Sequence, residues 1–317
     1  MKSSKVGIID CVSAGFLAVY RKPALLIVPV LLDLLLWFMP TISPQPIVSS
    51  LIDSLSSTEI RIETATIDQE TQPSTPLAPT ESFTTKDLEA LGTANLAGIL
   101  GMHVQSYLAF PSPGRSGQTT IGVTSWQGTV LSLLFFILGS VVIGTIYLDM
   151  LAQQVKTGAP WPVREGLLFR LVLRLLGYLA VVAAIYGTIA ATCMILIAVA
   201  YPLLPVIVLL GLTIAFISLV YLFVGEAALF MEDVEPIQAV KKSFVFAREH
   251  MVSLIGLVLL TTVVSLGLQL ALSRIATHPL GLPAAILLNA CVMTALTFAV
   301  MNYYWYHTKG EVSGPQP

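Results

Sequence analysis

Long apolar stretches separated by short polar ones dominate the pattern of this chain. Residues 175–225 hold no charged side chain, and at about 1.5 Å per helical residue this stretch can cross a membrane twice. Tyr201, Pro202 and Pro205 mark the predicted turn between the two crossings. The other predicted spans are residues 24–38, 127–150, 251–272 and 282–306. The pattern therefore predicts an all-α integral membrane protein with six transmembrane helices.

Amphipathic segments precede the first, third and fifth spans, at residues 6–20, 163–176 and 236–250. In the last segment, Pro236 can begin a helix, because the first helical residue needs no N–H donor. Apolar stripes run along the first and last segments: Ile8, Ile9, Val12, Phe16 and Val19, and then Ile237, Val240, Phe244 and Ala247. We expect these segments to be elbow helices in the membrane interface, with ordinary solvated loop helices as the alternative.

A faint internal repeat links the two ends of the chain. A shift of 228 positions matches apolar residues of the first elbow and span to those of the last, beginning with Ile9 and Ile237. With the elbow at residues 163–176, this match indicates three elbow-plus-hairpin units in parallel orientation. The alternative is chance, because apolar sequence matches itself easily.

Residues 41–126 differ from the rest of the chain, because they are rich in Ser, Thr and Pro and more acidic than basic. Residues 72–80 are typical of a flexible linker. From Thr84 the pattern becomes helical, with Leu88, Leu91 and Leu96 spaced to face a hydrophobic surface. Apart from that helix, we expect this region to be partly disordered or lightly packed on the membrane. The chain thus divides into residues 1–40, 41–126 and 127–317.

The composition agrees with a membrane protein, since 11% of the residues are charged against roughly 25% in soluble domains. A net charge of -2 argues against nucleic acid as a partner. Cys11, Cys193 and Cys291 are isolated in apolar sequence, so neither a disulfide framework nor a metal site is predicted. We expect membrane lipids, and other membrane protein subunits, as partners.

Lysine and arginine residues orient the six spans. With a cytoplasmic N-terminus, twelve of the sixteen lie on the cytoplasmic side, and Arg61, Lys86, Arg115 and Arg274 lie outside. We therefore predict a multi-pass protein of the cell membrane, with both termini in the cytoplasm and residues 41–126 outside.

Asp33 lies inside the first span, roughly 13 Å deep in a bilayer about 30 Å thick. It interrupts the apolar core and no A-x-A-like cleavage site follows, which argues against a signal peptide. A carboxylate at this depth is a candidate functional group, because its insertion costs a few kcal/mol. Asp33 can couple protons or cations in a cavity. Alternatively it is a structural acid, bonded to Asn289 or a nearby hydroxyl, or displaced to the interface by Pro29.

Asp149 and Glu226 are two further candidate polar residues, near the cytoplasmic ends of the second and fourth spans. At these positions water, Arg170 or Arg174 can reach the carboxylates. The functional hypothesis is the same as for Asp33, and a structural role is again the alternative.

Known catalytic motifs are missing from the sequence: no P-loop, G-x-G-x-x-G, H-E-x-x-H or G-x-S-x-G is present, and the four histidines lie on separate segments. The sequence therefore predicts no catalytic residue, no cofactor and no metal site. Small residues spaced four apart indicate close helix packing, within the chain or at a dimer face. They are Ser140 and Gly144; Ala183, Gly187 and Ala191; and Ala295 and Ala299.

Two short motifs carry a family resemblance. After a basic elbow, the first span reads P-x-L-L-x-x-P, and a later segment reads E-x-x-x-x-x-E-D-x-x-P-x-x-A-x-x-x-S. The residues are Pro23, Leu25, Leu26 and Pro29, and then Glu226, Glu232, Asp233, Pro236, Ala239 and Ser243. The chain resembles a group of bacterial multi-pass proteins similar to the membrane domain attached to some glycerophosphodiester phosphodiesterases. The resemblance covers the spans but not residues 41–126, and it implies a topology without any active-site residue, since these 317 residues leave no room for the catalytic barrel.

These observations favour a non-enzymatic accessory, assembly or lipid-environment protein that works through helix packing and its elbows. The alternative is a small permease or exporter that uses Asp33, Asp149 or Glu226. A lipid-modifying enzyme is a third hypothesis, and it requires acids and histidines to converge in one pocket.

Overall fold

The computed structural model of the chain describes residues 7–50, 52, 95–109, 120–159, 165–276, 278 and 281–309. Five of its helices are long and apolar enough to cross a membrane: α5 (Trp126–Thr157), α6 (Leu168–Val199), α7 continued by α8 (Leu204–Glu232), α10 (Met251–Ile275) and α11 (Gly281–Lys309). A sixth crossing results if α1 (Ile8–Arg21) and residues Pro23–Phe38, which meet at 96°, are counted as one broken span. The predicted all-α, multi-pass membrane protein is confirmed.

Local sequence explains where these helices begin and end. The Ser125 hydroxyl caps α5 by accepting the Gly128 N–H at 3.1 Å, and Gly158 ends the helix with a φ of 71°. The predicted turn between the third and fourth spans is present as a 3₁₀ turn, η6 (Tyr201–Leu203), followed by α7 (Leu204–Leu222). A break after α7 then starts the short helix α8 (Gly225–Glu232).

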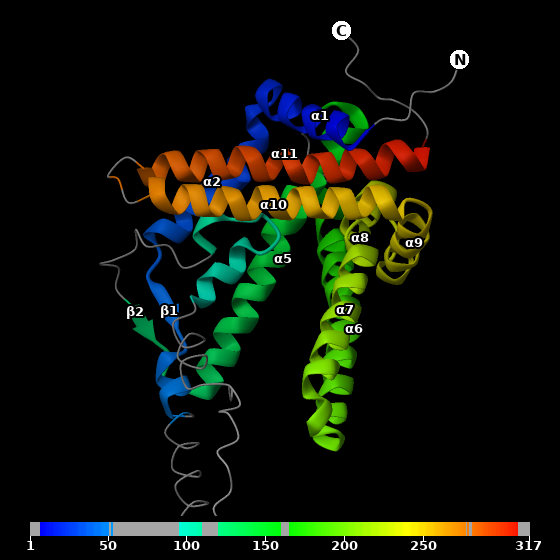
Figure 1. Ribbon diagram of the computed structural model, residues 1–317. Helices are drawn as coiled ribbons and strands as arrows, with labels where there is room; N and C mark the ends of the chain where they lie inside the picture. The colour runs from blue at the N-terminus through cyan, green and yellow to red at the C-terminus, as the bar shows by residue number, and fades with distance from the viewer. Residues whose placement is uncertain are drawn as a thin grey trace, which may run out of the picture.

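The helices meet around α8. Figure 1 shows α10 and α11 side by side, with α5 and the α6–α7 hairpin extending away from them and α1 against the opposite face of α11. Residues of α8 contact α5, α6 and α11, and five consecutive α8 side chains are buried: Ala227, Ala228, Leu229, Phe230 and Met231. The core is therefore centred on this short helix, where the long helices converge.

The elbows at the two ends of the chain match in the structure as the repeat predicts. The last elbow is α9 (Pro236–Glu249), which begins at Pro236 as expected, and its bounds equal those of α1 shifted by 228 positions. The buried positions of α1 are also buried in α9, which buries Phe246 in addition, and the exposed positions agree, including Ile9 at 77% and Ile237 at 60%. The agreement in boundaries and burial favours duplication over chance.

The faces that these elbows bury match the predicted apolar stripes only at Val19 and Ala247. Small residues make the contacts instead, and the buried sets are Cys11, Gly15 and Val19 in α1 and Ala239, Ser243, Phe246 and Ala247 in α9. A Cβ atom on Gly15 would lie 2.2 Å from the Ala295 carbonyl oxygen of α11, so α1 fits there only without a side chain. Close helix contact selects small residues, which leaves most of the bulky stripe outside the protein core.

The elbow predicted at residues 163–176 is not a separate helix where the structure describes it. After the 3₁₀ turn η5 (Glu165–Leu167), α6 runs without a break from Leu168 to Val199. Nothing between these residues breaks a helix, since the segment lacks proline and its charged residues are few. The segment therefore extends a long helix, and the third unit differs from the other two.

Part of the polar region 41–126 packs inside the helical body. Strands β1 (Thr41–Ser43) and β2 (Thr120–Gly122) pair in parallel and hold its two ends together. Between them, the 3₁₀ turns η2 (Leu96–Gly101) and η3 (Tyr107–Ala109) are largely buried against α5 and α2 (Ile27–Phe38). The helix predicted from Thr84 lies mostly outside the described residues. Its end at Leu96 does face a hydrophobic surface, but as 3₁₀ turns in the core rather than as a light covering.

The predicted small-residue motifs fall into two groups. Ser140 and Gly144 are buried where α5 packs against residues 95–109, called the η2 segment from here on; Ala295 packs beneath α1, and Ala299 is buried on the same helix, so both motifs serve packing within the chain. The α6 motif around Gly187 is exposed, and a Cβ atom there would meet nothing within 4 Å in the described part of the chain.

Candidate binding cavity

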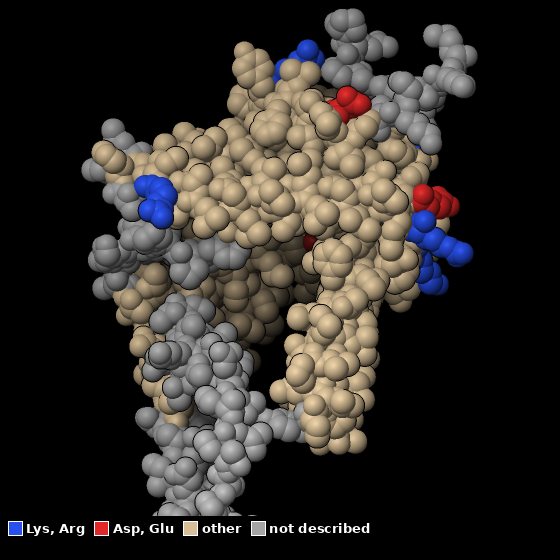
Figure 2. All heavy atoms as spheres, viewed as in Figure 1, with Lys and Arg blue, Asp and Glu red and all other residues tan. Residues whose placement is uncertain are grey.

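A cavity of about 640 Å³ lies between the η2 segment, α5, α6, α7, α8, α10 and α11. Figure 2 shows the molecule hollowed beneath α10, beside the α6–α7 hairpin, with an acidic side chain visible in the hollow and the other charged side chains of this view at the outer surface. Most of the wall is apolar, for example Leu148, Leu179, Val182 and Phe223. A cavity of this size and lining is typical of small-molecule sites.

One ionisable pair lies in the cavity wall. Glu226, in the first turn of α8, approaches His103, with 3.3 Å between its Oε1 and the imidazole Nδ1. The His103 side chain is 5% exposed, whereas the Glu226 side chain is 36% exposed. The imidazole therefore supports the carboxylate from within the protein, while the carboxylate remains accessible from the cavity.

Glycines on α5 make room for His103. A Cβ atom on Gly144 would lie 2.7 Å from the His103 Cβ, and one on Gly139 would lie 2.7 Å from a Leu100 methyl carbon. Only hydrogen atoms at these positions allow the η2 segment to lie against the middle of α5. The glycines thus place the imidazole opposite α8.

Asp33 anchors the segment that carries His103. Its carboxylate is fully buried and accepts the hydroxyl of Ser106 and the backbone N–H groups of Tyr107 and Leu108, the latter two at 3.3 and 3.1 Å. Of the structural alternatives from sequence, a bond to Asn289, a bond to a hydroxyl or displacement to the interface, the hydroxyl bond is thus observed. Asp33 is absent from the described cavity wall, so the structure places it as a positioning residue rather than as a cavity acid.

Asn289 is the second anchor of this segment. Its side-chain amide on α11 donates to the Gln105 carbonyl at 2.9 Å, instead of bonding to Asp33. Gln105 has a φ of 51°, a left-handed conformation that is rare for residues other than glycine. The hydrogen bond from Asn289 holds this strained turn, which lies two residues after His103.

Hydroxyl and amide groups line the α10 side of the cavity, at Thr261, Thr262, Ser265 and Gln269. Several hydroxyls of the wall already donate their proton to the protein. Thr261 donates to the Leu257 carbonyl at 2.9 Å, Thr297 to the Met293 carbonyl at 2.9 Å, and Tyr178 to the Leu222 carbonyl at 3.0 Å. These oxygens can therefore only accept hydrogen bonds from a molecule in the cavity.

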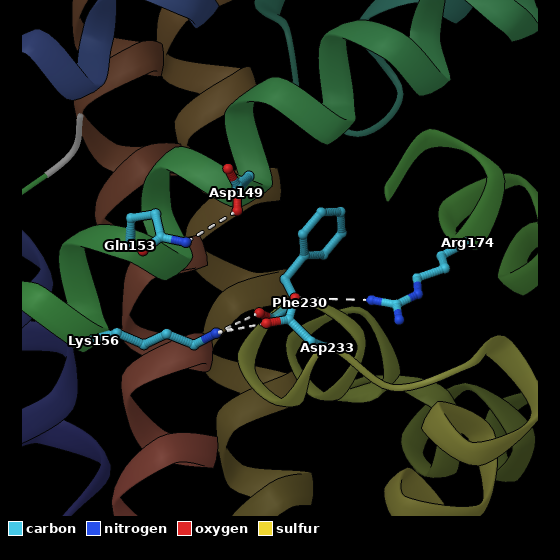
Figure 3. A network of polar contacts seen from close by, with 6 residues as sticks. All are labelled: Asp149, Gln153, Lys156, Arg174, Phe230 and Asp233. Atoms are coloured by element: carbon cyan, nitrogen blue, oxygen red, sulfur yellow. Dashed lines mark hydrogen bonds and ion pairs between the residues drawn. The ribbon is translucent and has the colours of Figure 1, made fainter. Parts of the chain in front are cut away.

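Asp149 belongs to a separate polar network at the ends of α5, α6 and α8 (Figure 3). Its Oδ1 accepts the Gln153 amide at 3.3 Å, and its buried Oδ2 has no hydrogen-bond partner in the part of the chain that the structure describes. Asp149 does not line the cavity. The preceding residue in the sequence, Leu148, does line the cavity.

Asp233 is the charged centre of the same network. Lys156 and Arg174 approach its carboxylate at 4.0 and 3.9 Å, and Lys156 also donates to the Phe230 carbonyl at 2.9 Å. Arg174 therefore pairs with Asp233, rather than with Asp149 or Glu226 as the sequence suggested. The next residue, Glu232, accepts from Lys242 of α9 and from the Tyr304 hydroxyl of α11. These contacts join five helices at one end of the molecule.

The histidines are less scattered than their sequence positions suggest. His250 and His307 lie with their ring centroids 4.8 Å apart, next to Phe246 and Tyr303. No group of three His, Cys, Asp or Glu side chains that could hold a metal ion occurs among the described residues. No metal site can thus be built from that part of the chain.

Of the three acids chosen from sequence, Glu226 alone lines the cavity, and its partner His103 was missed. His103 was missed because it lies in the region expected to be outside the membrane. A usable signal was the run of residues 95–110, NLAGILGMHVQSYLAF, which is apolar, rich in small residues and holds no charged residue other than histidine. Such a run fits a segment that inserts among helices.

No protein-family model, curated protein or solved structure matches this chain. The residues and geometry described above therefore carry the functional argument alone.

Proposed function

We propose that this protein is a non-enzymatic, multi-pass membrane protein that binds an amphiphilic molecule in the cavity. The supporting observation is a cavity of about 640 Å³ with apolar walls, a single carboxylate and imidazole, and a row of hydroxyl and amide groups. Apolar walls accept a hydrocarbon tail, and a few polar groups fix the orientation of a head group. Membrane lipids and lipid-like molecules have this composition.

The non-enzymatic part of the proposal is supported by the surroundings of His103. In the described part of the chain, no Ser, Thr or Cys side chain is hydrogen-bonded to its imidazole, which instead contacts Glu226. Nucleophilic catalysis requires a nucleophile within hydrogen-bond reach of its base. A histidine and an acid do converge here, as a lipid-modifying enzyme would need, but no activated nucleophile accompanies them.

This proposal can be tested by filling the cavity with a large side chain and measuring the lipid that remains bound to the protein. Val182 of α6 lines the cavity, whereas the neighbouring Ala183 is exposed on the outside of the same helix. We expect Val182→Trp to lose the lipids that co-purify with the wild-type protein in a mild detergent, as measured by native mass spectrometry. The matched variant Ala183→Trp should retain them. Equal lipid content in all three proteins would contradict binding in the cavity.

A permease or exporter is the second candidate function, because Glu226 and His103 form an ionisable pair inside an apolar cavity. Among the acids chosen from sequence, Glu226 is the one that can contact a transported molecule. Proteoliposome uptake of the bound molecule, with and without a proton gradient, separates the two functions. Transport that is lost in Glu226→Gln while binding to the variant remains would favour the permease.

The proposed localisation is the cell membrane, with cytoplasmic termini and residues 41–126 on the outer side, from where residues 95–109 insert among the helices. Lys156, Arg174 and Lys242 gather around the junction of α8 and α9, where the positive-inside rule places a cytoplasmic surface. Modification by a membrane-impermeant thiol reagent of a cysteine placed at Ser313 or at Ser82 tests this orientation.

We keep further membrane protein subunits as proposed partners, and the resemblance to the phosphodiesterase membrane domain as a proposed relationship.

A further inference from the structure

The described part of the cavity wall carries an acidic side chain but no lysine or arginine. Among the described lining residues, Glu226 is the only acid, and the one histidine, His103, already faces the Glu226 carboxylate. The partly buried cations Lys156 and Arg174 contact Asp233 in the separate network at the helix ends. A negatively charged head group in the cavity would therefore face a carboxylate without a compensating cation, which is costly in an apolar environment.

Several hydroxyls of the wall offer only acceptors to the cavity, although the hydroxyls of Thr262 and Tyr186 and the Gln269 amide can also donate. The hydroxyls of Thr261, Thr297 and Tyr178 donate to backbone carbonyls, and Ser265 donates to the Met293 sulfur at 3.5 Å. Each of these oxygens presents lone pairs, without a proton, to the cavity. An alkylammonium group has three N–H donors and no acceptor, so it complements such a wall, whereas a phosphate oxygen does not.

We infer that the cavity selects an amphiphile whose head group is a positively charged amine, held by the Glu226 carboxylate. This inference rests on the proposed binding function and names its ligand class. The His103 imidazole, buried behind the carboxylate, holds Oε1 at 3.3 Å, and the partial exposure of Glu226 leaves the group accessible to the amine. The polar groups from Thr261 to Gln269 extend along about 12 Å of α10, so they can accept further hydrogen bonds from a longer head group.

The test compares three probes with the same twelve-carbon chain: dodecylamine, dodecanol and dodecyl phosphate. Binding to the purified full chain in a neutral maltoside detergent is measured by native mass spectrometry titration. We expect dodecylamine to bind at least about tenfold more tightly than dodecanol, and dodecyl phosphate to bind most weakly. In Glu226→Gln, dodecylamine should fall to the affinity of dodecanol, while dodecanol binding stays the same.

A second variant keeps the test decisive if Glu226→Gln does not fold. Gln269 lines the cavity from α10, and Gln269→Lys places a cation in the wall. This variant should bind dodecyl phosphate more tightly than the wild-type protein does, and dodecylamine less tightly.

Identification of the lipids that co-purify from the native membrane distinguishes the source of the amine. Enrichment of amine-bearing lipids indicates a lipid ligand, and binding of added dodecylamine alone indicates a soluble amphiphile.

The outcomes separate the two proposals. If none of the three probes binds, or if Val182→Trp leaves their binding unchanged, the cavity is not a binding site and the proposed function fails. If all three bind equally, or dodecyl phosphate binds best, the cavity binds amphiphiles but the selection of an amine is wrong.

Discussion

Asp33 and Glu226 are both carboxylates in apolar helices, and the structure gives them opposite surroundings. Asp33 is fully buried, and within the described residues it accepts hydrogen bonds from Ser106 and from Tyr107 and Leu108 at the start of η3. Glu226 contacts one imidazole and remains 36% exposed on the side chain. An acid inside a membrane protein is thus a ligand-binding candidate only when its partners leave part of it accessible, and depth in the bilayer does not distinguish the two cases.

The largest effect on stability is expected for Asp33→Ala. The change leaves the donors on Ser106, Tyr107 and Leu108 without their acceptor in a buried site, which should destabilise the protein by on the order of 3 kcal/mol. Thermal unfolding of the detergent-purified protein, followed by size-exclusion chromatography with fluorescence detection, measures the loss. A melting temperature equal to that of the wild type would show that Asp33 does not anchor the segment.

A smaller loss is expected for Gly144→Ala. The added methyl group would lie 2.7 Å from the His103 Cβ, so the segment has to move, at a cost of about 1–3 kcal/mol and with weaker binding of dodecylamine. Gly187→Ala on α6 is the matched control, because a Cβ atom there meets nothing within 4 Å, and alanine should stabilise the helix by about 0.5 kcal/mol. If the two variants behave alike in thermal unfolding, the close contact at Gly144 does not position His103.

The smallest effect on stability is expected for Glu226→Gln. The amide can keep a contact with His103, so the free energy of unfolding should change by less than about 1 kcal/mol. The same variant should no longer gain thermal stability from added dodecylamine, because ligand binding to the folded state is what raises the melting temperature. A loss of stability as large as that of Asp33→Ala would place Glu226 among the structural acids and end the contrast between the two residues.

Sequence patterns located the helices well, because length and apolarity determine where a chain can cross a membrane. The predicted start at Pro236 and the turn before Leu204 agree with the structure. The buried faces of the elbows could not be predicted in the same way. In a lipid environment an apolar side chain needs no protein partner, so the stripe with Ile9 and Ile237 does not show which face packs.

The cavity could be predicted only in part, for a different reason. Glu226 stands out in sequence, because a charge ends a long uncharged stretch. Its contact with His103 joins two segments 123 positions apart and depends on glycines of α5 and on the anchor at Asp33. No periodic pattern encodes such contacts, since each depends on the positions of at least three other elements.

The packing of α1 on α11 has a consequence for the order of assembly during synthesis. The small face of α1 is closed by the Ala295 turn of α11, so α1, which is synthesised long before α11, lacks this partner until α11 is in place. The Asn289 bond to Gln105 imposes the same delay on the segment that carries His103. A chain in which α11 is not yet inserted would leave this face of α1 uncovered and that segment without its Asn289 anchor, so the insertion of α11 is the step that locks these two parts in place.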